Sequence, residues 1–188
     1  MRKRDEPVRL TTIYTRGGDG GETSLGDGSR ASKLDGLVRG FGAVDELNSV
    51  LGWARVEARD ARLARIQNEL FDLGADLSVP YVDGDAKLRV TQALIDRLET
   101  DCDEANAPLP ELTSFVLPGG TEAAARLHIV RAVCRRVELD VLEIATVRPV
   151  NPLVPVYLNR LSDLLFIVAR AANAGGEEPL WTPGGPSG

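Results

Sequence analysis

The feature that most constrains this chain is the apolar pattern of the long segment from about Gly120 to Arg148. Its apolar side chains recur every three or four residues, at Leu127, Val130, Cys134, Val137, Val141 and Ile144. That spacing is typical of the buried face of an α-helix. The segment therefore predicts a single helix of about 29 residues, roughly 43 Å long at about 1.5 Å per residue.

A second row of side chains runs beside this core row. His128, Arg131, Arg135 and Glu138 follow one another at steps of three, four and three, so they share one helix face. Two arginines that border a core, in a chain whose net charge is −6, call for an anionic partner. His128 is the only histidine, which excludes a multi-histidine metal site, and alone it is more typical of a hydrogen-bonded polar residue than of a ligand.

Helical periodicity also appears elsewhere in the chain. The further predicted helices are Phe41 to Glu57, Asp60 to Leu77, Thr91 to Asn106, and a last helix opened by Pro152 and Pro155 that runs to about Ala174. Almost no strand pattern and no internal repeat are found. Helices of this length joined by short connectors pack best as an antiparallel bundle. We therefore expect an all-α, five-helix up-and-down bundle that forms a single domain over residues 1–188.

The two ends of the chain have a different composition. Residues 1–36 are mostly a glycine-rich arm, too rich in glycine to form a helix, with at most a short extended stretch around Ile13 and Tyr14. Residues 175–188 are rich in proline and glycine and are predicted to form a flexible tail.

Composition excludes several classes of function. With 22 Lys+Arg against 28 Asp+Glu, the chain lacks the basic surface of a nucleic-acid-binding protein. No run approaches the ~18 apolar residues of a membrane span. Two scattered cysteines, Cys102 and Cys134, without an apolar signal segment predict a cytoplasmic protein with reduced thiols that fill core space.

The glycine arm carries the first candidate site. It combines glycines, hydroxyls and cations, in the order Thr15, Arg16, Gly17, Gly18, Asp19, Gly20, Gly21, Glu22, Thr23, Ser24, with Lys33 following. Glycines let backbone N–H groups approach a phosphate chain closely. The arm matches neither the P-loop nor the dinucleotide fingerprint. It is therefore either a different phosphate cradle or simply a flexible arm.

Three further positions have two interpretations each. Asp45 is either a partner for Arg131 inside the bundle or part of a solvated helix start. Asn159 would bond a purine or ribose, or else another helix. Phe115, in the apolar stretch Phe-Val-Leu-Pro-Gly-Gly before the long helix, is either ordinary core or the wall of a flat pocket.

Taken together, five segments resemble the PduO-type ATP:cob(I)alamin adenosyltransferases. They are TRGGDGGETSL with Lys33, GAVDELN with Gly52, FVLPGG, LHIVRAVCRRVE, and YLNRLSDLLF with Ala169 and Arg170. They occur in family order and cover the chain from about Thr15 to Arg170. Two positions depart from the family pattern: Arg16 stands where lysine is common, and Leu139 where arginine is frequent.

The resemblance implies a homotrimer of ferritin-like bundles with active sites at the subunit interfaces. ATP and cobalamin would be the substrates, with Mg²⁺ held mainly through the ATP phosphates. The implied ATP-binding residues are Thr15, Arg16, Gly17, Gly18, Asp19, Thr23, Ser24, Lys33, Arg135, Arg136, Glu138 and Asn159. The implied catalytic residues are Arg131, Arg135, Glu138, Phe115 and Asp45.

In the implied reaction, the 5′-deoxyadenosyl group of ATP moves to the cobalt of reduced cobalamin, and triphosphate leaves. Phe115 would fill the lower face of cobalt, and an Asp45–Arg131 pair would hold the surrounding loop and helix. A reductase and an adenosylcobalamin-dependent client enzyme are the implied partners. The alternatives are an ATP-binding corrinoid carrier or sensor with little turnover, and an unrelated helical scaffold.

Overall fold

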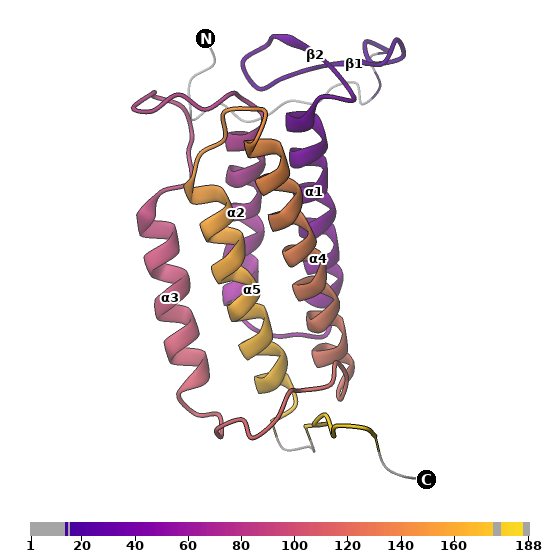
Figure 1. The fold of residues 1–188 in the computed structure, drawn as a ribbon, viewed down its shortest axis with the longest axis vertical. Helices are drawn as coiled ribbons and strands as arrows, with labels where there is room; N and C mark the ends of the chain where they lie inside the picture. The colour runs from indigo at the N-terminus through magenta and orange to yellow at the C-terminus, as the bar shows by residue number, and fades with distance from the viewer. Residues whose placement is uncertain (1–13, 15, 175–177, 186–188) are drawn as a thin grey trace.

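Five antiparallel helices lying side by side form the body of the protein (Figure 1). The computed structural model describes residues 14, 16–174 and 178–185. The helices are α1 (Gly36–Ala54), α2 (Arg62–Leu77), α3 (Gln92–Asn106), α4 (Glu122–Ala145) and α5 (Leu153–Ala172). The predicted all-α, five-helix bundle is confirmed.

Helix α4 lies at the centre of this arrangement and packs against both α1 and α5, while α2 packs on α1 and α3 on α5. The core row predicted from the sequence is buried along α4: Leu127, Val130, Cys134 and Val137 each have no exposed surface. Cys134 also donates a hydrogen bond from Sγ to the Leu158 carbonyl at 3.3 Å. Burial of these side chains between three helices fixes which face of α4 is left for other contacts.

Helix α1 begins at Gly36, five residues before the predicted start. The Asp35 side chain caps it by accepting a hydrogen bond from the Leu37 N–H at 2.9 Å. Gly40, which reads as a helix breaker, is needed for packing, because a Cβ there would lie 2.9 Å from Ile144 Cδ1 on α4. Gly40 therefore allows α1 and α4 to approach closely and does not interrupt the helix.

Helix α4 has 24 residues, fewer than the predicted 29. It begins after Thr121, whose hydroxyl accepts from the Ala124 N–H at 3.2 Å. Gly120 precedes it with φ of +97°, a backbone conformation that favours glycine and keeps the helix from starting earlier. At about 1.5 Å per residue, α4 spans roughly 36 Å.

The glycine arm contains a two-stranded hairpin that the sequence did not predict, with Glu22–Ser24 (β1) antiparallel to Arg30–Ser32 (β2). It lies at the end of the bundle where α1 begins and α4 ends (Figure 1). Arg148, just after α4, forms an ion pair with Asp35, which caps α1, and so joins the end of α4 to the start of α1. Ile13, in the stretch predicted to be extended, lies outside the described residues.

Residues 178–181, within the segment predicted to be a flexible tail, contact the connector between α3 and α4. Leu180 forms an antiparallel bridge with Val116, in the connector between α3 and α4. Both segments lie at the end of the bundle opposite the hairpin (Figure 1). Part of the chain beyond α5 therefore has a defined place against the loop that carries Phe115.

Candidate functional site

The row of polar side chains predicted on the long helix lies on α4. The Arg131 guanidinium stands 6.0 Å from the centre of the Phe166 ring, and its buried Nε has no hydrogen-bond partner. Arg135, one turn further along, is exposed and forms no ion pair with any described residue. The two arginines are therefore free to meet an anion from outside the chain.

Glu138 and Asn159 continue this row and connect two helices. The Asn159 amide on α5 donates to the Glu138 carboxylate on α4 at 3.2 Å. The interhelical role considered for Asn159 is thus observed. The bond leaves the side-chain Oδ1 of Asn159 and the Oε2 of Glu138 as acceptors that suit ribose hydroxyls or a base amine.

His128 differs from the hydrogen-bonded residue that the sequence suggested. It is only 3% exposed, yet neither ring nitrogen has a partner among the described residues. Burial and the nearby Arg131 cation lower its pKa, so the ring stays neutral at physiological pH. His128 and Arg131 line the same hollow of about 600 Å³ with Pro118 of the preceding loop.

Phe115 is not core. Its side chain is 76% exposed, on the loop at the end of the bundle where α4 begins. From that loop, the row runs through His128, Arg131 and Arg135 to Glu138. Ten residues of helix separate His128 from Glu138, which corresponds to about 15 Å. An apolar group thus lies at one end of the row and the glycine hairpin beyond the other.

Cations gather around the glycine turn before β1. The Lys33 side chain covers Gly18, where an added Cβ would lie 3.1 Å from Nζ. The Lys33 N–H donates to the Gly21 carbonyl at 2.9 Å. Arg16 has φ of +59°, unusual for a residue other than glycine. Gly17, Asp19, Thr23 and Ser24 of the predicted site lie in the same hairpin region, whereas Thr15 lies outside the described residues.

Arg30 was missed by the sequence analysis. Its guanidinium donates to the Gly17 carbonyl at 2.7 Å and to the Ser24 hydroxyl at 3.3 Å, and so ties the turn to both strands. The hydrogen bond to Ser24 partly occupies a hydroxyl that was predicted to meet phosphate. Arg30 reaches the glycine turn because the hairpin register sets it opposite Ser24. No pattern in the sequence predicts that register.

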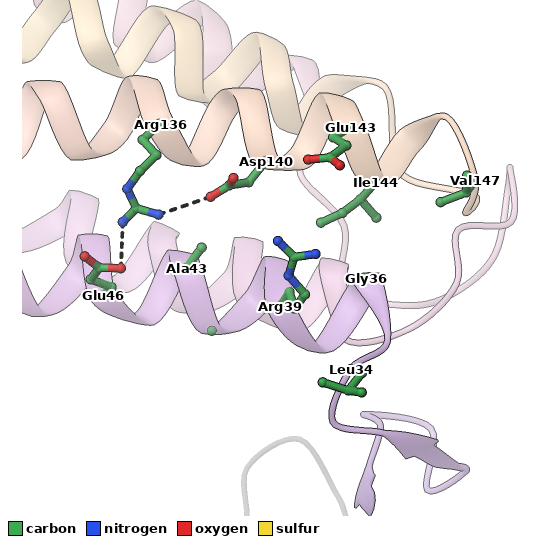
Figure 2. A pocket seen from close by; sticks show the side chains of 11 residues that line it. Leu34, Gly36, Arg39, Ala43, Glu46, Arg136, Asp140, Glu143, Ile144 and Val147 are labelled. Atoms are coloured by element: carbon green, nitrogen blue, oxygen red, sulfur yellow. Dashed lines mark hydrogen bonds and ion pairs between the residues drawn. The ribbon is translucent and has the colours of Figure 1, made fainter. Parts of the chain in front are cut away.

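Arg136 faces a different environment from Arg135. Figure 2 shows it in the groove between α1 and α4, paired with Glu46 at 2.6 Å and with Asp140 at 3.1 Å. This groove encloses about 500 Å³ and also receives Arg39 and Glu143. Arg136 thus already has anionic partners inside the chain, whereas Arg135 has none among the described residues.

The predicted Asp45–Arg131 pair is wrong for a single chain. Asp45 is exposed in a groove between α1 and α2, with Phe71 and Gly74, and no ion pair connects it to Arg131. Arg131 instead lies toward Phe166 on α5. Helix spacing placed each residue on a face correctly, but it does not say which faces of two helices meet.

Three further observations concern the chemistry of the described residues. They contain no group of three or more His, Cys, Asp or Glu side chains able to hold a metal ion. None of their helices is long and apolar enough to cross a membrane. Cys102 and Cys134 are free thiols, and burial raises the pKa of Cys102 to about 11, which keeps it protonated and unreactive.

Comparison with known proteins agrees with this geometry. A family model described as cobalamin adenosyltransferase matches residues 13–172. A corrinoid adenosyltransferase of Mycobacterium leprae is 47% identical over 95% of this chain and 99% of its own length. One from Bacillus subtilis is 41% identical over 86% of each chain.

Solved structures give the same result. A variant PduO-type ATP:corrinoid adenosyltransferase from Lactobacillus reuteri, complexed with cobalamin and ATP, is 33% identical with a TM-score of 0.84. The match covers 90% of this chain and 99% of that one. Sequence and fold agree over nearly the whole length, and the chain belongs to the cobalamin adenosyltransferase family, in its PduO type.

Proposed function

We propose that this protein transfers the 5′-deoxyadenosyl group of ATP to the cobalt of cob(I)alamin, forming adenosylcobalamin and releasing triphosphate. The observation that carries the proposal is the order of side chains along α4. The exposed aromatic Phe115 lies at one end, and Arg131 and Arg135, which form no ion pair with any described residue, lie further along the helix. That order would seat a corrin ring at the Phe115 end and bring the triphosphate of ATP to Arg135, where the glycine hairpin of a neighbouring subunit would complete the site.

ATP would lie with its nucleoside beside Glu138 and Asn159. Its triphosphate would reach the arm, where Arg16, Lys33 and the glycine turn supply cations and N–H groups. Arg135 offers a planar guanidinium fork for two phosphate oxygens. We keep Arg136 in the proposed set, although binding phosphate would require it to release Glu46 or Asp140.

Cobalt supplies the nucleophile, so the protein needs no general base. The electron pair of Co(I) forms the bond to C5′, and the C5′–O bond breaks with its electrons leaving on triphosphate. Cobalt becomes formally Co(III). The leaving group is highly anionic, and Arg135 with the arm would stabilise the charge that develops on it. The Mg²⁺ that we propose would be held by the phosphates themselves, since the described residues offer no acidic cluster.

Phe115 would act before this step. Cob(II)alamin is hard to reduce while a ligand occupies its lower axial face, because that ligand stabilises Co(II). An exposed aromatic ring at the foot of the α4 row is placed to fill that face and exclude water. A four-coordinate cobalt would then accept one electron from a reductase more readily. The product would pass to an adenosylcobalamin-dependent client enzyme.

We propose that the chain works as a homotrimer with its sites at subunit interfaces. Asp45 and Arg131 each form no ion pair with any residue that the structure describes, so contact across a subunit boundary is how that pair would form. Residues 1–188 would act as one domain, with 1–36 as the ATP-binding arm and 175–188 as the tail. We place the reaction in the cytoplasm, where ATP is abundant and both free thiols stay reduced.

A direct assay tests the proposal. The protein is mixed with MgATP and chemically reduced cob(I)alamin, and the corrinoid spectrum is followed while triphosphate is quantified. We expect one triphosphate for each adenosylcobalamin over many turnovers. Binding of both substrates with no more than one product per site would instead identify an ATP-binding corrinoid carrier or sensor.

A further inference from the structure

The loop that carries Phe115 is held by the end of the chain. The Leu117 N–H donates to the Pro179 carbonyl at 2.8 Å, and the Trp181 N–H donates to the Phe115 carbonyl at 2.7 Å. The Ser114 hydroxyl adds a bond to the Trp181 carbonyl at 2.7 Å. We name residues 178–181 the C-terminal strap. It pairs with the loop through one antiparallel bridge, between Leu180 and Val116, and so fixes the backbone on both sides of Phe115.

The strap also contacts the Phe115 ring. The rings of Trp181 and Phe115 meet edge to face, with centroids 5.9 Å apart and planes at 63°. This geometry is favourable for two aromatic rings. Phe115 is 76% exposed, so little of the described chain other than Trp181 covers its ring. Trp181 is itself 44% exposed, so both rings remain accessible to a ligand.

The strap is anchored to α5 before it reaches the loop. The buried Arg170 guanidinium donates from Nε to both carboxylate oxygens of Glu178, at 3.0 and 3.2 Å. It also donates to the Pro110 carbonyl, in the connector itself, at 2.8 Å. Arg170 thus joins helix, strap and loop. Its side chain is only 5% exposed, so removal of either partner would leave a charge that water reaches poorly.

We propose that Trp181 is a positioning residue for Phe115, and that the strap sets the height and tilt at which the phenyl ring meets the lower face of a planar corrinoid. The inference rests on the proposed function. A ring that must displace an axial ligand has to be held, because a freely rotating side chain loses conformational entropy on every encounter. The strap orders it before the substrate arrives.

The test compares two starting substrates. Turnover is measured from cob(II)alamin with a one-electron reductant and from chemically supplied cob(I)alamin, both with MgATP. Electron paramagnetic resonance gives the fraction of four-coordinate Co(II) in the ATP-bound protein. The variants are Trp181→Ala, the conservative Trp181→Phe, Phe115→Ala, and Val82→Ala as an exposed apolar truncation away from this loop.

We expect Trp181→Ala to lower turnover from cob(II)alamin about tenfold and to reduce the four-coordinate fraction, with turnover from cob(I)alamin within about threefold of wild type. Trp181→Phe should recover most of both signals, since it keeps an aromatic edge against Phe115. Val82→Ala should match wild type. A structural defect alone would lower turnover from both substrates equally and would not be rescued by Phe.

Equal losses of Trp181→Ala on both substrates, or an unchanged four-coordinate fraction, would overturn the inference while leaving the transferase proposal intact. Phe115→Ala should lower turnover from cob(II)alamin more than turnover from cob(I)alamin. Equal losses on the two substrates would overturn the proposed wedge, and with it the role of Trp181. Failure of the wild-type protein to convert cob(I)alamin would overturn the proposed function itself. The three outcomes are distinguishable in one set of assays.

Discussion

At the scale of single residues, adjacent arginines on α4 have different environments. Arg136 is neutralised by Glu46 and Asp140, while Arg135 lacks an ion pair within the described chain. A cation without a counter-ion is available to a ligand and is worth more in a site from which water is excluded. Both arginines were expected to bind ATP, and their different partners in the structure distinguish them.

Removal of the free arginine should therefore be costly. We expect Arg135→Ala to reduce kcat/KM by about 10²–10³, the usual effect of losing one charge-stabilising donor. Arg136→Ala should lose less, because its charge is already balanced. Arg59→Ala is the matched control, because Arg59 is exposed between α1 and α2 and, like Arg135, forms no ion pair with any described residue. Steady-state kinetics with MgATP and cob(I)alamin measure this, and an Arg135→Ala rate within threefold of wild type would remove that residue from the mechanism.

His128 gives a pH-dependent prediction. Its pKa in the folded protein lies below the ordinary value of 6.5, because of burial and Arg131. As pH falls through 6.5, the unfolded chain binds a proton that the folded chain resists, so folding loses stability. Between pH 7.5 and 5.5, the free energy of unfolding should therefore decline more in the wild type than in His128→Gln. Urea unfolding at fixed protein concentration measures both, and parallel declines would contradict the assignment.

Sequence reasoning found the residue types of the site and their faces, but not their partners. Periodicity places Arg131, Arg135 and Glu138 on one face because 3.6 residues make a turn. It gives no information on which neighbouring helix lies opposite. For that reason an interhelical hydrogen bond was only one of two interpretations of Asn159, with Glu138 not foreseen as its partner, and the Asp45–Arg131 pair was wrong within one chain.

At the scale of elements, the connection from the Phe115 loop into α4 depends on one glycine. Gly120 has φ of +97°, and a Cβ there would collide with the Asn173 side chain. Asn173 accepts from the Thr121 N–H at 2.9 Å and donates to the Gly119 carbonyl at 3.1 Å. The end of α5 thus holds the start of α4.

We expect Gly120→Ala to destabilise the protein by about 1–3 kcal/mol from backbone strain alone, with more from the displaced Asn173. Gly74→Ala is the control, because it is helical in α2 and a Cβ there meets nothing within 4 Å. That substitution should stabilise by about 0.5–1 kcal/mol. Thermal unfolding of the two variants should shift in opposite directions, and similar shifts would refute the argument.

Helix types and most boundaries followed from apolar spacing and proline, since both act locally. The elements that the sequence did not predict depend on distant contacts. Buried Asp76 receives hydrogen bonds from Arg89 and Asn151, at 2.7 Å each, and so orders the connector after α2. The strap owes its place to Arg170 and the Phe115 loop in the same way. Long-range pairing of this kind leaves no local pattern.

At the scale of the whole molecule, the proposal divides each site between subunits. The hairpin lies at the end of the bundle where α1 begins, away from the middle of α4 that carries Arg135 (Figure 1). A closed three-fold ring repeats one interface three times and so makes three equivalent sites. The assembly should have about three times the 20.2 kDa mass of one chain.

Mixed assemblies test this division. Lys33→Ala and Arg135→Ala subunits, each inactive alone, are unfolded together and refolded. If Lys33 and Arg135 of one site belong to different subunits, about one quarter of sites in random trimers keep both residues and regain activity. If both residues of a site come from the same subunit, no site is intact and no activity returns. Size-exclusion light scattering confirms that mixing leaves the assembly state unchanged.

The central claim is that the unpaired cationic face of α4 binds the polyphosphate of ATP while the Phe115 end receives the corrinoid. The most direct measurement is a crystal structure of the protein with MgATP and cobalamin. We predict phosphate oxygens within hydrogen-bonding distance of Arg135 and the glycine hairpin, with the corrin ring between Arg131 and Phe115. A nucleotide bound elsewhere, with Arg135 still turned to solvent, would contradict the account.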